Sequence, residues 1–200
     1  MYRRAGKRVL DIALVLALAP FAIVLIAGLA VLAVTDGRNP FYSQSRVGRL
    51  GREFRMWKIR TMVPDADAKL DAYLEAHPDA RVEWDTKQKL DHDPRITRFG
   101  HFMRRSSMDE LPQLWNVLRG EMSIVGPRPM MPSQKSLYPG RAYARLRPGI
   151  TGNWQVSDRN ASSFAARADF DASYLGSLSL RQDIAILLKT AVVMVNRTGR

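Results

Sequence analysis

The sequence contains no cysteine and only three histidines among its 200 residues. The lack of cysteine excludes a disulfide framework, a thiolate metal site and a cysteine nucleophile, and it is compatible with a cytoplasmic setting. The histidines do not have the spacing of a zinc motif such as HExxH, so we expect no zinc site built from histidine. The glycine-rich phosphate loops GxxxxGKS/T and GxGxxG are also absent.

Acidic residues are scarce relative to basic ones. Lysine and arginine total 31 against 19 aspartates and glutamates, which gives a formal net charge of +12. Such a charge favours a polyanionic partner, which is nucleic acid, an anionic membrane surface or a phosphorylated substrate. No nucleic-acid-binding motif accompanies the charge. A chain of this length fits one domain with a sizeable core.

Near the N-terminus, residues 12–34 form an apolar run of 23 residues without a charged side chain. As a straight helix this run would reach about 34 Å, enough to cross a hydrocarbon layer of ~30 Å. It is longer than the roughly 7–15 apolar residues of a secretory signal peptide. The run therefore predicts a membrane-embedded helix.

Basic residues flank this run on both sides, from Arg3 to Arg8 before it and from Arg38 to Arg60 after it. Positive flanks favour keeping both ends on the cytoplasmic side. Pro20 is a natural kink site because it lacks an N–H and clashes with the preceding turn. It divides the run into arms of roughly 8 and 14 residues, neither of which spans alone. We expect residues 1–36 to form a re-entrant helix-break-helix hairpin, with a proline-kinked spanning helix as the alternative.

The remaining residues, 37–200, are expected to form one compact α-rich unit, so the fold class expected is α+β and mainly α. The turn formers in "VGRLGREF" indicate a small β-hairpin within residues 37–62. "SIVGPRPMMP" reads as a short strand or extended piece that enters a rigid proline loop. "RLRPGITGNWQVSDRN", residues 145–160, reads as a loop because it contains the turn formers Pro148, Gly149 and Gly152. The last helix is expected in the core or as an interfacial helix on lipid. Helices are expected at residues 65–75, 109–118, 169–175 and 179–195.

The adjacent carboxylates Asp109 and Glu110 have two interpretations. Ser107 and Glu110 fit the capping box S-x-x-E, with Asp109 adding favourable charge at a helix N-terminus. Pro112 suits a first-turn position. In this interpretation the pair only starts a helix.

The basic surroundings favour a chemical interpretation. Arg128 follows on a loop stiffened by Pro127 and Pro129, and four arginines precede the pair, Arg95, Arg98, Arg104 and Arg105. Guanidinium groups match phosphate oxygens in bidentate fashion, as a diphosphate requires. One carboxylate could bind Mg²⁺, which takes only one or two carboxylates beside water and phosphate oxygens. The other could attack phosphorus and form an acyl phosphate.

Four sequence blocks resemble the bacterial sugar transferases, the small monotopic phosphoglycosyl transferases. These blocks are "KRVLD" at residues 7–11, "FYSQSRVGRLGREFRMWKIRTM" at 41–62, "DPRITRFGHFMRRSSMDELPQLWNVLRGEMSIVGPRP" at 93–129 and "RPGITGNWQVSDRN" at 147–160. The resemblance implies a monotopic enzyme of the bacterial inner membrane, with residues 37–200 as its compact cytoplasmic catalytic domain. It also implies transfer of a hexose 1-phosphate from a UDP-sugar to polyprenyl phosphate, usually undecaprenyl phosphate, with release of UMP. This reaction initiates exopolysaccharide or other glycoconjugate synthesis.

The same resemblance implies residue roles. Asp109 is the expected nucleophile that forms a covalent phosphosugar, and Glu110 is expected to contribute to Mg²⁺ binding. Arg104 and Arg128 match arginines that bind phosphates or the nucleotide, and Lys58 matches a basic residue near that centre. With these we group three further expected substrate-binding residues, Arg95, Pro127 and Pro129.

Two positions depart from the family pattern. The hairpin break reads Ala19-Pro20 where many members have Ser-Pro, so a hydroxyl that could satisfy freed backbone groups is missing. Asp158 replaces the glycine of the usual "NGRN". The sugar is not identified, with galactose or glucose favoured, and a homodimer is left open. A membrane-tethered nucleic-acid-binding protein and a non-catalytic membrane scaffold are the alternative functions, although we expect no nucleic-acid partner.

Overall fold

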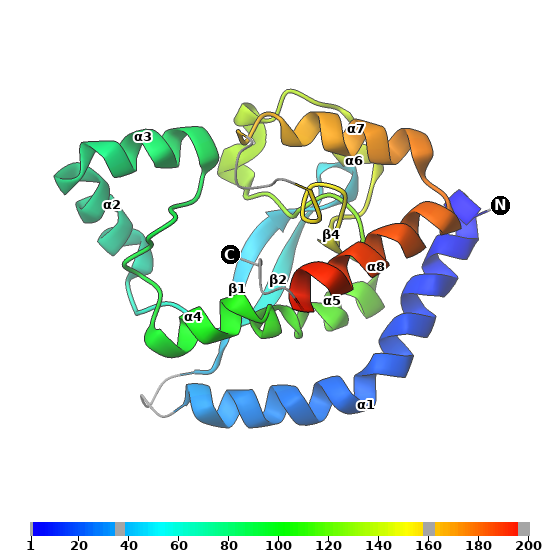
Figure 1. Ribbon diagram of the computed structural model, residues 1–200, viewed down its shortest axis with the longest axis horizontal. Helices are drawn as coiled ribbons and strands as arrows, with labels where there is room; N and C mark the ends of the chain where they lie inside the picture. The colour runs from blue at the N-terminus through cyan, green and yellow to red at the C-terminus, as the bar shows by residue number, and fades with distance from the viewer. Residues whose placement is uncertain (1, 35–38, 158–162, 196–200) are drawn as a thin grey trace.

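The computed structural model describes residues 2–34, 39–157 and 163–195 (Figure 1). Helices predominate and strands are few, which confirms the predicted mainly helical α+β class. The strands are β1 Phe41–Val47, β2 Glu53–Ile59, β3 Ser123–Val125 and β4 Gly149–Thr151. The α-helices are α1 Lys7–Ala33, α2 Ala66–Ala76, α3 Pro78–Lys87, α4 Arg98–Arg105, α5 Gln113–Arg119, α6 Ala142–Arg145, α7 Arg167–Ser177 and α8 Leu180–Val195. Shorter helical turns lie at Tyr2–Gly6, Arg49–Gly51, Met108–Glu110 and Pro132–Leu137.

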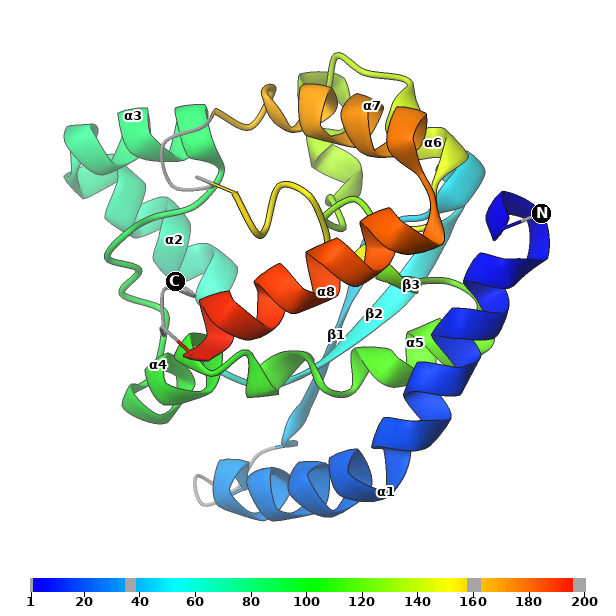
Figure 2. The same ribbon diagram turned by 45° about the vertical axis from the view of Figure 1, so that its right-hand side comes forward.

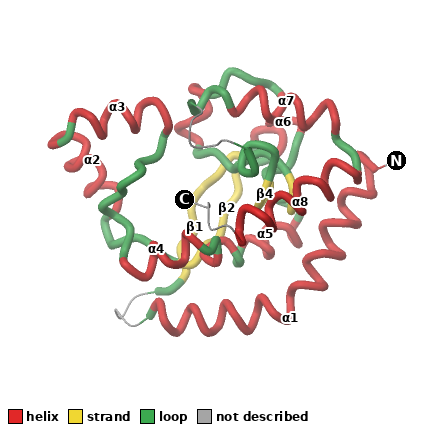
Figure 3. Tube along the Cα trace, viewed as in Figure 1, coloured by secondary structure: helices red, strands yellow, loops and turns green. Residues whose placement is uncertain are grey.

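The apolar N-terminal segment forms α1, one helix of 27 residues that includes Pro20. The helix bends sharply near its middle, and in sequence Pro20 stands at the middle of the helix (Figures 1 and 3). A proline inside a helix removes one backbone hydrogen bond and crowds the preceding turn, which accounts for a bend. The predicted kink site is thus found, although α1 is one bent helix and not two helices separated by a break.

Only one face of α1 packs against the rest of the molecule. Its buried apolar side chains are Val15, Ala22 and Leu29, spaced seven residues apart, as expected for a single helix face. Val15 joins the main core and Leu29 a smaller core cluster. The other faces expose large apolar side chains, Val9, Ile12, Leu16, Leu18, Phe21, Ile23, Val24, Leu25, Val31 and Leu32. In the described residues, α1 is the only helix long and apolar enough to cross a membrane.

The predicted β-hairpin is confirmed. Strands β1 and β2 pair antiparallel from Phe41 opposite Ile59 to Val47 opposite Glu53. The turn between them requires a positive φ at Leu50 (61°) and at Gly51 (76°), a conformation that glycine adopts without strain. The hairpin places Lys58 on the strand that runs toward the acidic turn.

A second, parallel pair joins β3 to β4, with Ser123 opposite Gly149 and Val125 opposite Thr151. The backbones approach so closely that a Cβ on Gly126 would lie 2.3 Å from the Arg147 carbonyl oxygen. The "SIV" segment is therefore a strand, whereas β4 lies in a segment that was expected to be a loop. The close approach fixes the start of the proline loop, which begins directly after Gly126.

The helices differ from expectation at the start of α5 and in the short helices α3, α4 and α6, which were not predicted. The helix expected from Asp109 begins instead at Gln113 as α5, after a 3₁₀ turn at Met108–Glu110. Thr97 caps α4 by accepting a hydrogen bond from the backbone N–H of Gly100 at 2.9 Å. The helices expected at residues 65–75, 169–175 and 179–195 are confirmed as α2, α7 and α8.

Helix α8 lies between α7 and α5 in both views (Figures 1 and 2). It buries Asp183 and Ile186 on its inner face. Its outer face exposes a stripe of apolar side chains at four-residue spacing, Leu180, Ile184, Leu188 and Val192. The helix therefore has a core face, which confirms the first alternative, and an exposed apolar outer face, whose contact with lipid stays a prediction.

Candidate active site

The acidic turn does not form the predicted capping box. Ser107 has a left-handed backbone, and its side chain makes no cap hydrogen bond, while Pro112 is the residue that precedes α5. The Glu110 side chain instead accepts a hydrogen bond from Lys58 Nζ at 2.7 Å. Glu110 thus contacts Lys58, which is distant in sequence, instead of capping the start of the helix. Both carboxylates are therefore available for chemistry.

Lys58, Asp109 and Glu110 form the centre of the candidate site. Lys58 Nζ lies 2.7 Å from Glu110 Oε1 and 3.4 Å from Asp109 Oδ2. Asp109 is only 3% exposed. The Lys58 ammonium group therefore bridges the carboxylates of two adjacent residues of a 3₁₀ turn.

The environments of the two carboxylates shift their pKa values in opposite directions. Burial raises the pKa of Asp109 and the neighbouring Glu110 carboxylate adds to the rise, while Lys58 opposes it. Burial also disfavours the charge of Glu110, but Lys58 and Arg128 outweigh this effect and lower its pKa. Paired groups whose pKa values are pushed apart are typical of sites that divide two chemical roles.

Arg104 and Arg95 lie on the α4 side of this centre and differ in how they are bound. Arg104 Nε donates to Thr61 Oγ1 at 2.9 Å, and burial lowers its pKa although Asp109 acts to raise it. Arg95 forms a buried two-point ion pair with Asp93, at 2.8 and 2.7 Å. The geometry of Arg95 supports a structural role in the loop before α4, and its predicted contact with substrate stays a prediction.

Arg128 is held on the proline loop by contacts to the loop backbone. The Pro127 carbonyl accepts from the backbone N–H of Gly149 at 2.8 Å, and the Pro129 carbonyl accepts from Arg46 Nη1 at 3.3 Å. The Arg128 guanidinium lies 5.7 Å from the centre of the Trp154 ring. The structure thus brings Arg128 to the same region as Glu110, whose pKa it lowers.

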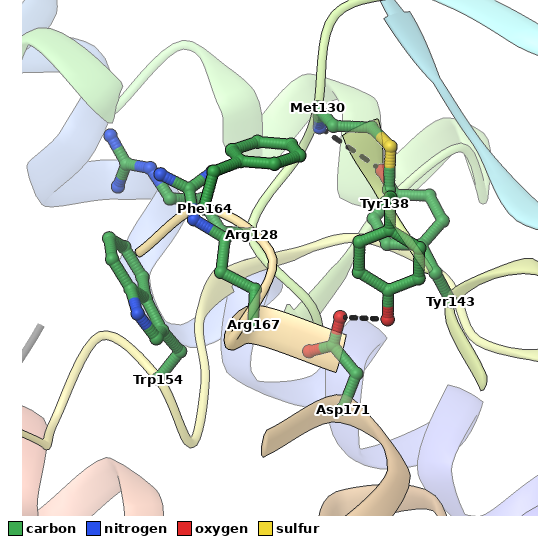
Figure 4. Close-up of a pocket in the computed structure, with 8 residues that line it drawn as sticks. All are labelled: Arg128, Met130, Tyr138, Tyr143, Trp154, Phe164, Arg167 and Asp171. Atoms are coloured by element: carbon green, nitrogen blue, oxygen red, sulfur yellow. Dashed lines mark hydrogen bonds between the residues drawn. The ribbon is translucent and has the colours of Figure 1, made fainter. Parts of the chain in front are cut away.

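A small aromatic pocket adjoins Arg128 and includes residues that sequence reasoning did not select. Figure 4 shows Phe164 and Trp154 beside the arginine side chains and the Asp171 carboxylate directed at the Tyr138 hydroxyl, which donates to it at 2.8 Å. The pocket is lined by Arg128, Met130, Tyr138, Tyr143, Trp154, Phe164, Arg167 and Asp171.

Two arginines of this region, Arg46 and Arg167, were not predicted as site residues. Arg46 belongs to a strand and Arg167 starts α7, more than fifty residues after the acidic pair. The basic "SRVG" within the second resembling block was the available indication for Arg46, and nothing local distinguishes Arg167. The predicted loop residues Asp158, Arg159 and Asn160 lie outside the described residues.

The donors at this centre fit Mg²⁺. Asp109 and Glu110 supply hard carboxylate oxygens, and Mg²⁺ needs only one or two of these when phosphate and water complete its shell. Over residues 2–34, 39–157 and 163–195, no cluster of three or more acidic, histidine or cysteine side chains offers an all-protein metal cage. The chemistry therefore fits a cation shared with a phosphorylated substrate.

Comparison with known proteins identifies relatives along the whole chain. The chain is 46% identical over 195 residues to the UDP-galactose-lipid carrier transferase of Erwinia amylovora, which covers 96% of this chain and 41% of that protein. It is 43% identical over 188 residues to the exopolysaccharide production protein ExoY of Rhizobium meliloti, covering 92% and 83% of the two chains. It is 46% identical over 166 residues to the undecaprenyl-phosphate galactose phosphotransferase of Salmonella typhimurium, covering 82% and 35%.

The chain thus spans less than half the length of the Erwinia and Salmonella relatives and most of the length of the Rhizobium one. Residues 2–197 match the family described as bacterial sugar transferase. That match extends across both α1 and the acidic turn, so it includes the membrane-type helix and the candidate centre together. The chain belongs to the bacterial sugar transferase family.

Proposed function

We propose that the protein transfers a hexose 1-phosphate from a UDP-sugar to undecaprenyl phosphate and so initiates exopolysaccharide or another glycoconjugate. The observation that carries the proposal is a buried carboxylate, Asp109, held beside Lys58 and Glu110 in a basic environment. The names of the Erwinia and Salmonella relatives support a lipid-linked acceptor and favour galactose as the sugar.

In this mechanism the Asp109 carboxylate attacks the phosphorus that carries the sugar. A phosphorus–oxygen bond forms to Asp109, and the bond to the leaving phosphate breaks, which releases UMP. An oxygen of undecaprenyl phosphate then attacks the same phosphorus. The bond to Asp109 breaks, the carboxylate is regenerated, and the product is a lipid diphosphate sugar. The two steps together need no reactant besides the UDP-sugar and undecaprenyl phosphate.

The cationic side chains near Asp109 assist the attack of its carboxylate on the anionic phosphate of the substrate. Lys58 opposes the rise that burial causes in the pKa of Asp109, and so favours its ionised, attacking form. Arg104 and Arg128 are placed to offset charge on the phosphate oxygens. Glu110, with its lowered pKa, is the residue that would hold Mg²⁺. When bound, such a cation neutralises phosphate charge.

We also propose that residues 1–36 are embedded in the bacterial inner membrane as a re-entrant hairpin, with residues 37–200 at the cytoplasmic face. The exposed apolar side chains of α1 support lipid contact, since large exposed apolar patches mark membrane or partner surfaces. The bend in α1 and the basic residues on both sides of it support same-side entry and exit.

The decisive test is Asp109→Asn, which keeps the size of the side chain and removes its nucleophilic charge. We expect UMP release from UDP-galactose with undecaprenyl phosphate and Mg²⁺ to fall at least about a thousandfold, because loss of a covalent nucleophile typically costs that much or more. The assay should include UDP-glucose and other UDP-sugars. Asp85→Asn on α3 is the matched control, since Asp85 is exposed and, among the described residues, forms an ion pair only with Arg81.

Two outcomes would count against the proposal. Full activity of Asp109→Asn would exclude Asp109 as the nucleophile. No turnover by the natural chain with any UDP-sugar, together with stable binding of a partner protein, would favour the non-catalytic scaffold.

A further inference from the structure

Three arginines from distant segments converge beside the candidate centre. They are Arg46 of β1, Arg128 of the proline loop and Arg167 at the start of α7. The Arg167 and Arg128 guanidinium groups lie 4.3 and 5.7 Å from the centre of the same Trp154 ring, and Arg167 also lies 4.5 Å from the Phe164 ring. Arg46 donates to Pro129, next to Arg128. We call this group the guanidinium cluster.

The cluster is held by aromatic rings and carbonyl groups and not by counter-ions. In the described parts of the chain, none of the three arginines forms an ion pair with a carboxylate. The nearby Asp171 carboxylate accepts instead from the Tyr138 hydroxyl. The Nε atoms of Arg46 and Arg167 are buried without a hydrogen-bond partner among the described residues.

Burying these guanidinium groups without counter-ions costs free energy unless an anion binds to them. Arg167 is only 9% exposed, and a buried charge without acceptors loses its hydration. Burial together with Arg128 lowers the pKa of Arg167 to about 9 and that of Arg46 to about 10. These shifts record first the loss of hydration on burial and then the repulsion of the neighbouring like charge. A bound oxyanion would offset the repulsion and would accept from the unpaired donors.

Two members of the cluster, Arg46 and Arg128, lie within electrostatic reach of the catalytic pair, since both act to lower the pKa of Glu110. Both are half-buried, whereas Arg167 is buried. The enclosed volume of the pocket that Arg128 and Arg167 help to line is about 10 Å³, room for roughly one water molecule. We therefore expect a larger anion to meet the cluster first at the more exposed Arg46 and Arg128.

We propose that Arg46 and Arg167, together with Arg128, bind a phosphate group of a substrate at this cluster. The planar forks of guanidinium groups suit tetrahedral phosphate oxygens, and a helix N-terminus at Arg167 adds favourable potential for an anion. The inference rests on the proposed function for the identity of the substrates. The phosphate belongs either to the diphosphate of the UDP-sugar or to the phosphate of the lipid acceptor.

The test uses the full-length protein in detergent or lipid discs with Arg46→Gln and Arg167→Gln as separate variants. Initial rates of UMP release are measured with UDP-galactose varied at saturating undecaprenyl phosphate, and then the reverse. We expect KM for one substrate to rise roughly tenfold to a hundredfold, the usual effect of losing a hydrogen bond to a charged group, with KM for the other unchanged. Arg81→Gln is the control because the Arg81 side chain is 58% exposed and lies on α3.

The substrate whose KM rises identifies the source of the phosphate. A second arm measures binding in the Asp109→Asn background, as the shift in melting temperature caused by UDP-galactose or by undecaprenyl phosphate. We expect Arg167→Gln to reduce the shift for the same substrate. This arm needs no turnover, so it separates failure of the inference from failure of the proposed reaction.

Unchanged KM values and unchanged ligand-induced shifts in both folded variants would overturn the inference. If Arg167→Gln does not fold, Arg46→Gln and the charge-conserving Arg167→Lys decide the question. Equal increases of KM for both substrates, with a lowered melting temperature of the free protein, would show a structural role and would also overturn it.

Discussion

At the scale of single residues, the position of Lys58 determines how the acidic pair behaves. Its ammonium group contacts both carboxylates, and the pKa of Asp109 is raised by burial and by Glu110 but restrained by Lys58. The attacking form of Asp109 is the carboxylate. The rate should therefore fall as the pH drops through the pKa of Asp109 in the folded protein.

Lys58→Met should move this acidic limb to higher pH. Without the ammonium group the pKa of Asp109 rises further, so a larger share of the enzyme is protonated at a given pH. The measurement is the pH profile of kcat/KM for UMP release. Lys87→Met, which removes a half-buried partner of Glu83 on α3, is the control. An acidic limb that stays in place or moves to lower pH would contradict the role given to Lys58.

The sequence alone identified the acidic pair and Lys58 but not their contact. The spacing of Ser107 and Glu110 predicted a local capping box, and the structure uses Glu110 for a partner 52 residues away. Arg46 and Arg167 were missed for the same physical reason. Their proximity depends on tertiary packing around Trp154, which no local pattern encodes.

At the scale of elements, α1 is joined to the catalytic part by buried polar contacts. Asp11 of α1 accepts hydrogen bonds at 2.9 Å from both the Ser123 hydroxyl and the Ile124 backbone N–H. These residues belong to β3, which leads directly into the loop of Arg128. Arg8 of α1 donates to the carbonyls of Val117 and Leu118 at the C-terminal end of α5. The membrane-type helix therefore supports the strand that positions the site.

Asp11→Ala should destabilise the protein by about 1–3 kcal/mol, because it leaves buried donors of β3 without an acceptor. We expect a melting temperature lower by roughly 2–8 °C in the same detergent. Asp11→Asn should cost less because its amide oxygen still accepts. Asp71→Ala on the exposed side of α2 is the control. Equal melting temperatures for Asp11→Ala and the natural chain would show that the hydrogen bonds from β3 to Asp11 do not stabilise the protein.

Elements were predictable where periodicity or turn chemistry is strong. The apolar run predicted α1, and Gly48 and Gly51 predicted the hairpin turn. Helix α4 was missed, although Thr97 three residues before Gly100 was a readable cap. Strand β4 has only three residues and is stabilised by a distant strand, so local propensity could not define it.

At the scale of the whole molecule, the apolar surface is concentrated on α1, with a second stripe on α8. The proposed re-entrant topology predicts that both ends of α1 face the cytoplasm. Because the natural chain has no cysteine, Ala5→Cys and Asn39→Cys introduce unique thiols at exposed positions before and after α1. Neither should react with a membrane-impermeant thiol reagent in intact cells, and both should react after permeabilisation. Labelling of only one from outside would establish a spanning helix.

The N-terminal segment and the first turn of α8 meet at Asp183, which is 0% exposed. It accepts hydrogen bonds from Lys7 Nζ at 2.7 Å, from the Tyr174 hydroxyl at 2.6 Å and from the hydroxyl of Tyr2. During synthesis, Lys7 emerges long before its partner, and the closure joins residues 176 positions apart. The N-terminal helix can thus reach lipid while the nascent chain is still growing, but the native core closes only after α8 has left the ribosome. With the proposed membrane location, α1 is therefore available to lipid before the candidate site is complete.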